Sequence, residues 1–185
     1  SPAPVNSTYV AIAKNFGVIF GTNLIFTANN FPAFKVSAEI CEDLWAPQSP
    51  SVAHAKAGAT IIVNLSCSDE TVGKADYRKN LVKTQSAKLV SGYVYCDAGE
   101  GESTTDMVFA GHNLICENGA VLAESKLFEN GLIYSEIDVE MLETERRRMA
   151  SVFVDSGYNN NETWAEKNGY FLQGFETFDN GAELT

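Results

Sequence analysis

The chain has 185 residues, of which 45% are hydrophobic, and a formal net charge of −11 at pH 7. This length and composition predict one globular domain with a full apolar core. The acidic balance argues against a nucleic-acid partner, and no run approaches the roughly 20 apolar residues of a membrane-spanning helix, so we expect no membrane contact and a cytoplasmic location.

The first part of the chain predicts short strands that lead to a cysteine. Residues 1–17 are polar and show little periodicity. Two strands are expected on either side of the turn 21–23, because Gly and Asn tolerate the positive φ of a tight turn, and a third leads directly to Cys41. These strands cover 18–20, 24–27 and 34–40.

The middle of the chain predicts a strand–helix–strand unit. Residues 59–65 are strongly apolar, as is typical of a strand buried on both faces, and 93–96 repeat this character. Between them, apolar residues recur at helical spacing over 75–90. A short helix over 52–57, with Ser51 as its N-cap, precedes the unit. Together with the strands that follow, these elements indicate a layered α/β sandwich.

The last part predicts hairpins, one helix and an irregular tail. Glycines and Asn–Gly pairs punctuate four expected antiparallel strands. These strands cover 107–110, 112–116, 120–124 and 132–137. A charged helix over 139–149, capped by Asp138, follows. The aromatic-rich segment 151–185 resembles a linker or packing strap, so we expect a domain over 1–150 and an arm over 151–185.

The cysteines and histidines lack the spacing of a metal site. They are Cys41, His54, Cys67, Cys96, His112 and Cys116. No pair has the C-x-x-C or H-x-x-x-H spacing of zinc ligands, so we expect reduced thiols and no metal. Cys96 and Cys116 fall inside predicted strands and are expected to be packing residues. Neither histidine has local support for a catalytic role.

Cys41 is the strongest candidate for chemistry. It stands where a strand ends, before Glu42 and Asp43, and strand ends in α/β folds present side chains to a crevice. A thiolate attacks carbonyl carbon, but it needs a base or a neighbouring cation. Glu39, two residues back on the same strand face, is either that base or a buried carboxylate paired to Lys35. The alternative to a nucleophile is a small core residue.

Two further loops follow buried strands. Cys67 is a rival nucleophile, but Ser66 and Ser68 on either side of it favour a hydroxyl-lined binding loop. Ser68 and Lys74 offer a hydroxyl and a cation to the charged end of an amino-acid substrate, unless Lys74 is simply solvated. The polar loop 97–106 lacks the Gly-Lys-Ser/Thr sequence of a phosphate loop, so we expect a substrate rim or a structural turn network there.

Four ordered motifs resemble those of one family. They are Glu39-Ile40-Cys41-Glu42-Asp43-Leu44-Trp45-Ala46-Pro47, Asn64-Leu65-Ser66, Gly99-Glu100-Gly101-Glu102-Ser103-Thr104-Thr105-Asp106 and Glu117-Asn118-Gly119-Ala120-Val121-Leu122-Ala123-Glu124-Ser125. In this order they resemble the glutaminase domains of glutamine-dependent NAD synthetases, which belong to the nitrilase-like carbon–nitrogen hydrolase superfamily. The resemblance covers roughly residues 18–150.

The resemblance implies an α-β-β-α sandwich and a Glu-Lys-Cys triad, in which Cys41 forms a glutamyl thioester. It implies glutamine contacts at Ser68 and Lys74, and it places Glu42 and Trp45 in the wall of the pocket. Lys74 stands where the family often has Arg, and Lys lacks the bidentate fork that grips a carboxylate. The resemblance implies no cofactor in this chain, because ATP and magnesium serve the family's separate synthetase domain, which receives the ammonia.

The family's catalytic Glu and Lys both precede the cysteine, the Lys by more than the 40 residues before Cys41, and neither Lys14 nor Lys35 has the family's surrounding motif. We therefore expect a hydrolase domain that lacks its N-terminal part and is inactive alone. The expected partners are glutamine, the missing segment, the synthetase domain and further copies in a homo-oligomer. A stand-alone amidase acting on another amide and a non-catalytic scaffold are the alternatives.

Overall fold

The computed structural model describes residues 8–13, 16–149 and 169–175. The elements follow in the order β1 (Thr8–Ala13), β2 (Phe16–Phe20), β3 (Leu24–Ala28), β4 (Lys35–Ile40), the 3₁₀ helix η1 (Cys41–Trp45), α1 (Pro50–Lys56), β5 (Ile61–Ser66), α2 (Lys74–Leu89), β6 (Gly92–Asp97), β7 (Leu114–Glu117), β8 (Ala120–Glu124), α3 (Val139–Arg148) and β9 (Phe171–Phe175). None of the described helices is long and apolar enough to cross a membrane.

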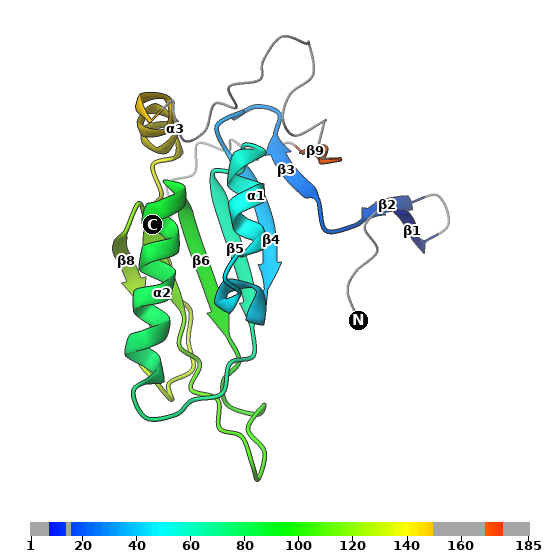
Figure 1. Ribbon diagram of the computed structural model, residues 1–185. Coiled ribbons are helices and arrows are strands. Elements are labelled where there is room, and N and C mark those ends of the chain that lie inside the picture. The colour runs from blue at the N-terminus through cyan, green and yellow to red at the C-terminus, as the bar shows by residue number, and fades with distance from the viewer. Residues whose placement is uncertain (1–7, 14–15, 150–168, 176–185) are drawn as a thin grey trace, which may run out of the picture.

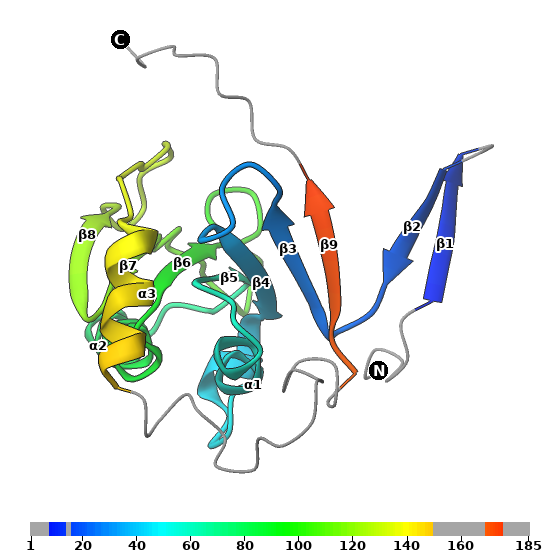
Figure 2. The ribbon, with the colours of Figure 1, turned by 90° about the horizontal axis from the view of Figure 1, so that it is seen from above.

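Seven strands form one mixed sheet in the order β8-β7-β6-β5-β4-β3-β9 (Figures 1 and 2). The central strands β4, β5 and β6 are parallel, while β7 and β8 extend the sheet in antiparallel fashion beyond β6. α2 connects β5 to β6, because a parallel pair needs a crossover connection rather than a tight turn. The predicted strand–helix–strand unit is therefore confirmed.

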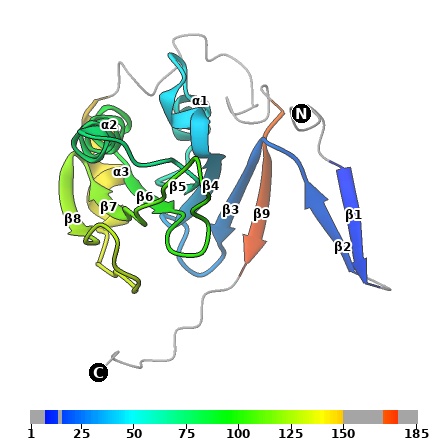
Figure 3. The same cartoon turned by 90° about the horizontal axis from the view of Figure 1, so that it is seen from below.

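One face of the sheet is covered by α1 and α2 (Figure 3). Ile62, Tyr93 and Tyr95 belong to the main core together with Val82 and Leu89 of α2. Burying each large apolar side chain contributes about 1.5–3 kcal/mol, so this contact between helices and sheet stabilises the fold strongly. The two helices form the outer layer on this face of the sheet.

Among the described residues, the opposite face of the sheet is covered at one end and exposed at the other. Val139, at the start of α3, packs with Val63 and Val94. Toward the C-terminal ends of the strands, Ile40 and Leu65 are register partners, and they are 63% and 61% exposed. An α-β-β-α sandwich packs a second sheet against such a face. The described residues thus form part of that sandwich.

Most of the expected helices and strands are present. The predicted strands 59–65 and 93–96 correspond to β5 and β6, and the predicted helices 75–90 and 139–149 correspond to α2 and α3. Asp138 caps α3 as expected, since its Oδ1 accepts the amide of Met141 at 2.8 Å. The buried side of α2 is more polar than an amphipathic helix predicts, and this polarity serves the site described below.

Two predicted strands are wrong, because residues 107–110 and 132–137 lie outside the sheet. Beside the first segment, the backbone forms an isolated hydrogen bond with another loop instead of a strand ladder. The Gly111 amide donates to the carbonyl oxygen of Ala98 at 2.8 Å. In the second segment, Leu132 is 95% exposed. The apolar residues of this segment therefore do not mark burial in the sheet, whose last strand on this side is β8.

Two local details also differ from expectation. The strands around the turn 21–23 form, but β2 pairs with β1 in a separate two-stranded sheet, whereas β3 pairs with β4. The N-cap of α1 is Ser49 rather than Ser51, because Pro50 occupies the first helical position, where its fixed φ suits a helix start. The Ser49 hydroxyl donates to the buried carboxylate of Glu39 instead, and it lies 2.6 Å from the Ser51 hydroxyl.

The tail was expected to be irregular, but part of it joins the sheet. Phe171–Phe175 forms β9, which pairs in parallel with β3, and Ile25 is the register partner of Leu172 (Figure 2). Tyr170, just before β9, is buried, and its hydroxyl lies 2.8 Å from Nδ1 of His54 in α1. The rest of 151–185 lies outside the described residues, and the division into 1–150 and 151–185 stays a prediction.

Candidate active site

β4 ends in a sharp turn that begins at Cys41. The φ of Cys41 is +49°, a left-handed value that costs a residue with a side chain about 1–2 kcal/mol. Asp43 closes the turn, because its Oδ2 accepts the amide of Ile40 at 2.8 Å. A strained strand-to-helix turn of this kind presents a nucleophile above the edge of a sheet. The half-buried Cys41 thiol therefore lies at the C-terminal edge of the parallel strands.

The loop after β5 meets the thiol from the side. The backbone amide of Cys67 lies 3.5 Å from Sγ of Cys41, in hydrogen-bonding geometry. An N–H directed at sulfur stabilises a thiolate more than a thiol, because a hydrogen bond to an ionised acceptor is stronger. Cys67 itself is exposed. The structure thus joins the predicted nucleophile to the predicted binding loop, with Cys67 contributing its backbone.

Glu39 is buried, but it is bonded neither to Cys41, as a base would be, nor to Lys35. It is 2% exposed, and its carboxylate accepts hydrogen bonds from the Ser49 hydroxyl at 2.5 Å, the Ser51 amide at 2.8 Å and the Tyr93 hydroxyl. These donors hold the carboxylate on the helix-covered side of the sheet. Lys35 pairs with Glu143 of α3 instead, at 3.6 Å.

Ser68 is fixed by a buried ionic cluster. Its amide donates to Oδ1 of Asp97 at 2.9 Å, and its hydroxyl accepts from Nη2 of Arg78 at 3.4 Å. Arg78 also pairs with Glu70 at 2.8 Å and with Asp97 at 3.7 Å. Burial raises the pKa of Asp97, although the Ser68 amide and Arg78 partly oppose this. The loop that carries Ser68 is therefore anchored at several points.

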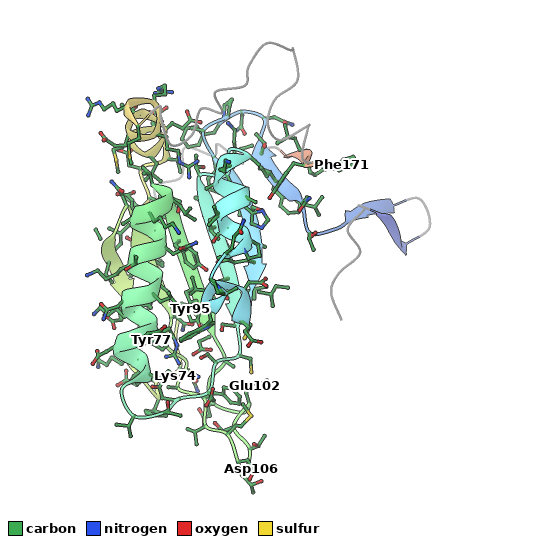
Figure 4. The ribbon with its side chains drawn as sticks, in the orientation of Figure 1. Lys74, Tyr77, Tyr95, Glu102, Asp106 and Phe171 are labelled. Atoms are coloured by element: carbon green, nitrogen blue, oxygen red, sulfur yellow. The ribbon has the colours of Figure 1, made fainter. Side chains whose placement is uncertain are left out.

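Lys74 and Trp45 lie close together in the structure. Nζ of Lys74 is 5.6 Å from the centroid of the Trp45 ring, and Tyr77 stacks on the same ring with a centroid distance of 5.3 Å. Lys74 also forms a salt bridge with Asp69, which lowers the pKa of that carboxyl. Lys74 and Tyr77 come from the start of α2, at the end of the molecule where the loops gather (Figure 4).

Glu42 and the loop after β6 form the outer part of this region. Glu42 belongs to η1, and its side chain is exposed. The loop after β6 carries Glu102 and Asp106 farther out, beyond the ends of the strands (Figure 4). Acidic side chains at this rim suit a polar substrate better than a phosphate-bearing one, because they repel further negative charge.

The remaining cysteines and histidines serve other contacts. Cys116 is buried, as expected of a packing residue, and burial raises its pKa to about 11, whereas Cys96 is exposed. His54 contacts Tyr170 and the Ala38 carbonyl oxygen. His112 lies between Arg78, at 3.1 Å, and Glu124, at 3.0 Å. Among the described residues, no group of three or more His, Cys, Asp or Glu side chains is arranged to hold a metal ion.

Several residues make contacts at the site that the sequence did not predict. They are Asn64, Tyr77, Arg78, Tyr93 and Asp97. Asn64 offered a signal, because an amide side chain inside a strongly apolar strand needs hydrogen-bond partners when it is buried. Arg78 offered no such signal, because a charged residue in a predicted surface helix is ordinarily solvated.

The chain belongs to the carbon–nitrogen hydrolase family, which matches residues 4–147. Its relatives include the glutamine-dependent NAD(+) synthetases of Mycobacterium bovis, 48% identical over 136 residues, and Mycobacterium leprae, 44% identical over 134 residues. These alignments cover 72% and 71% of this chain but 20% of each relative. The chain thus spans about a fifth of the length of these relatives.

Solved structures share the fold. A carbon–nitrogen hydrolase from Helicobacter pylori matches 69% of this chain and 47% of its own with a TM-score of 0.57 and 19% identity. A glutamine-dependent NAD(+) synthetase from Cytophaga hutchinsonii matches 66% of this chain and 18% of its own with a TM-score of 0.54 and 24% identity. The nitrilase-superfamily fold expected from the motifs is therefore confirmed.

Proposed function

We propose that this chain carries the nucleophile of a glutaminase, which hydrolyses the side-chain amide of glutamine to glutamate and ammonia. The observation that carries the proposal is the Cys41 thiol on its left-handed turn, with the Cys67 amide at 3.5 Å from the sulfur. The 48% identity to glutamine-dependent NAD(+) synthetases supports glutamine as the substrate.

In the proposed reaction, the Cys41 thiolate attacks the carboxamide carbon of glutamine, and the carbonyl oxygen becomes an oxyanion. The intermediate then collapses: the carbon–nitrogen bond breaks, the nitrogen takes up a proton, ammonia leaves, and a glutamyl thioester remains on Cys41. Water attacks the thioester carbon, which releases glutamate and restores the thiol. Ser68 and Lys74 would hold the charged end of glutamine, and Trp45 and Glu42 would line the pocket.

The proton transfers need a base and a cation that the resemblance assigns to a Glu and a Lys upstream of the cysteine. We therefore propose that the 185-residue chain alone does not turn over glutamine, because loss of one member of a catalytic triad already costs several orders of magnitude in rate.

We further propose that the ammonia serves a synthetase domain of the same longer protein, which amidates nicotinic acid adenine dinucleotide with ATP and magnesium. In this arrangement, the chain acts in the cytoplasm within a homo-oligomer. Its partners are glutamine and the other parts of that protein, and neither ATP nor magnesium is assigned to the residues described above.

A glutamine analogue with an electrophilic diazoketone side chain tests the proposal. In the longer protein, it should label Cys41, as located by peptide mass mapping, and free glutamine should protect the thiol. Cys41→Ala should abolish labelling, whereas Cys67→Ala keeps the backbone amide and should retain it. Labelling that free glutamine does not reduce, or that maps to Cys67, would contradict the proposal. Glutamine turnover by the 185-residue chain would contradict its predicted inactivity.

A further inference from the structure

The backbone amide and carbonyl of Cys41 are both contacted by one side chain. Asn64, in the neighbouring strand β5, accepts the Cys41 amide through Oδ1 at 3.0 Å and directs Nδ2 toward the Cys41 carbonyl oxygen at 3.5 Å. Asn64 is fully buried. A left-handed residue with a side chain persists only where its surroundings over-determine its conformation, and two contacts from one rigid amide do this.

The orientation of the Asn64 amide is set in turn by Tyr93. Nδ2 of Asn64 donates to the Tyr93 hydroxyl at 3.2 Å, and that hydroxyl donates to Oε1 of Glu39. Burial and the nearby Glu39 raise the pKa of Tyr93, so its hydroxyl stays protonated and able to donate. All three residues are at most 2% exposed.

These hydrogen bonds have only one consistent direction. Glu39 accepts hydrogen bonds from the Tyr93 hydroxyl, the Ser49 hydroxyl and the Ser51 amide, so Tyr93 gives its one proton to Glu39. The Tyr93 hydroxyl must then accept from Asn64, which turns Nδ2 toward Tyr93 and Oδ1 toward the Cys41 amide. A flipped Asn64 would place two donors face to face at Cys41, and it would leave Tyr93 with two acceptors and one proton.

We propose that Asn64 is a positioning residue for the reaction of Cys41, and that Glu39 and Tyr93 act through it by fixing which way its amide points. The Cys41 backbone is thereby locked so that the thiol stays beside the Cys67 amide. This inference rests on the proposed function in taking Cys41 as the nucleophile. In this proposal, the buried side chains of Glu39, Tyr93 and Asn64 control the conformation of the Cys41 backbone.

The test measures two properties of the 185-residue chain: the rate at which iodoacetamide alkylates Cys41, and the hydrogen-exchange rate of the Cys41 amide. Asn64→Leu keeps the shape of the side chain and removes both contacts. Tyr93→Phe leaves Asn64 in place but frees its orientation. Each variant should alkylate Cys41 several-fold more slowly and exchange its amide several-fold faster, since a single hydrogen bond corresponds to about a fivefold effect.

Tyr95→Phe is the matched control, because Tyr95 is also fully buried in β6 and its hydroxyl contacts Ser66 at 2.6 Å, outside the Glu39–Tyr93–Asn64 chain. The buried thiol of Cys116 reports general loosening, which would raise its own alkylation rate. The proposal predicts that Tyr95→Phe leaves Cys41 unchanged, and that Cys116 stays protected in Tyr93→Phe.

Unchanged Cys41 behaviour in folded Asn64→Leu or Tyr93→Phe would overturn the proposal, as would an equal effect of Tyr95→Phe. If Asn64→Leu does not fold, Tyr93→Phe decides alone. Iodoacetamide has no affinity for a glutamine site, so its result is separate from that of the glutamine analogue. A failed analogue with a positive iodoacetamide result would remove the glutaminase function and leave the control of the Cys41 backbone intact.

Discussion

The backbone amide of Cys67 lies 3.5 Å from the sulfur of Cys41, although 26 residues separate the two in the chain. The parallel pairing of β4 and β5 creates this contact, because the register joins Ile40 to Leu65 and the two loops leave the sheet together. The candidate site is therefore a product of strand register.

Removal of the Arg78 charge should strongly reduce the free energy of unfolding. Arg78 is fully buried against Glu70 and Asp97, so Arg78→Met would leave two buried carboxylates without their cation. We expect a loss of about 3–5 kcal/mol in the free energy of unfolding, measured by urea denaturation. Arg148→Met is the control, because Arg148 pairs with Glu145 at the surface, where a salt bridge contributes about 0–1 kcal/mol. Equal losses in the two variants would mean that the buried cluster adds no stability.

The stability of the fold should decrease in mildly acidic solution because of His54. Burial lowers the pKa of His54 below its ordinary 6.5, although Glu39 and Asp43 partly oppose this. The folded state thus keeps the ring neutral, while the unfolded state takes up a proton near pH 6.5. The contribution is complete above that pH and is lost as the pH falls toward the folded-state pKa.

Urea unfolding at about pH 7.5 and about pH 5.5 measures this effect. His54→Gln keeps an amide donor for the Ala38 carbonyl oxygen and removes the titration, so the difference in unfolding free energy between the two pH values should shrink. An unchanged difference would assign the pH dependence to other groups.

Lys74→Arg should improve the grip on an amino-acid carboxylate. Lys74 already pairs with Asp69, and a guanidinium can hold Asp69 and still direct N–H groups at a substrate. We expect half-maximal labelling of the longer protein by the glutamine analogue at a several-fold lower concentration. Lys79→Arg is the matched control, because Lys79 lies on the same helix and pairs with Glu124. If both variants label like the original protein, Lys74 is not a substrate contact.

Gly119→Ala should destabilise the hairpin of β7 and β8. Gly119 has φ +86°, and an added Cβ would lie 2.9 Å from Cβ of Ala87 in α2. Strain and crowding together predict a loss of about 1–3 kcal/mol in the free energy of unfolding, measured in urea. Gly131→Ala is the control, since no atom lies within 4 Å of its added Cβ and its φ is not left-handed. A loss no larger than that of Gly131→Ala would contradict the tight packing of this turn against α2.

Local patterns in the sequence predicted the central part of the fold. The apolar runs at 59–65 and 93–96 and the helical spacing between them identified β5, α2 and β6, because burial on both faces leaves a continuous hydrophobic pattern. The position of Cys41 at a strand end was equally local. The same reasoning failed at 132–137, where Leu132 and Tyr134 are exposed rather than buried against the sheet.

The partners of the buried polar groups could not be predicted in this way. Glu39 was expected to face Cys41 or Lys35, yet it binds Ser49, Ser51 and Tyr93. The alternation of side chains along a strand predicts which face of the sheet Glu39 occupies, but it does not predict which helix covers that face. The pairing of β9 with β3 was also unpredictable, because its contacts join residues far apart in the chain.

Local patterns and motifs were enough to predict a carbon–nitrogen hydrolase fold and a cysteine at the end of β4. They did not reveal what holds that cysteine, because its contacts with the Cys67 amide and the Asn64 side chain form only when separate elements come together. The physical reason is that hydrophobic periodicity encodes burial within one element, whereas hydrogen-bond direction depends on which elements become neighbours.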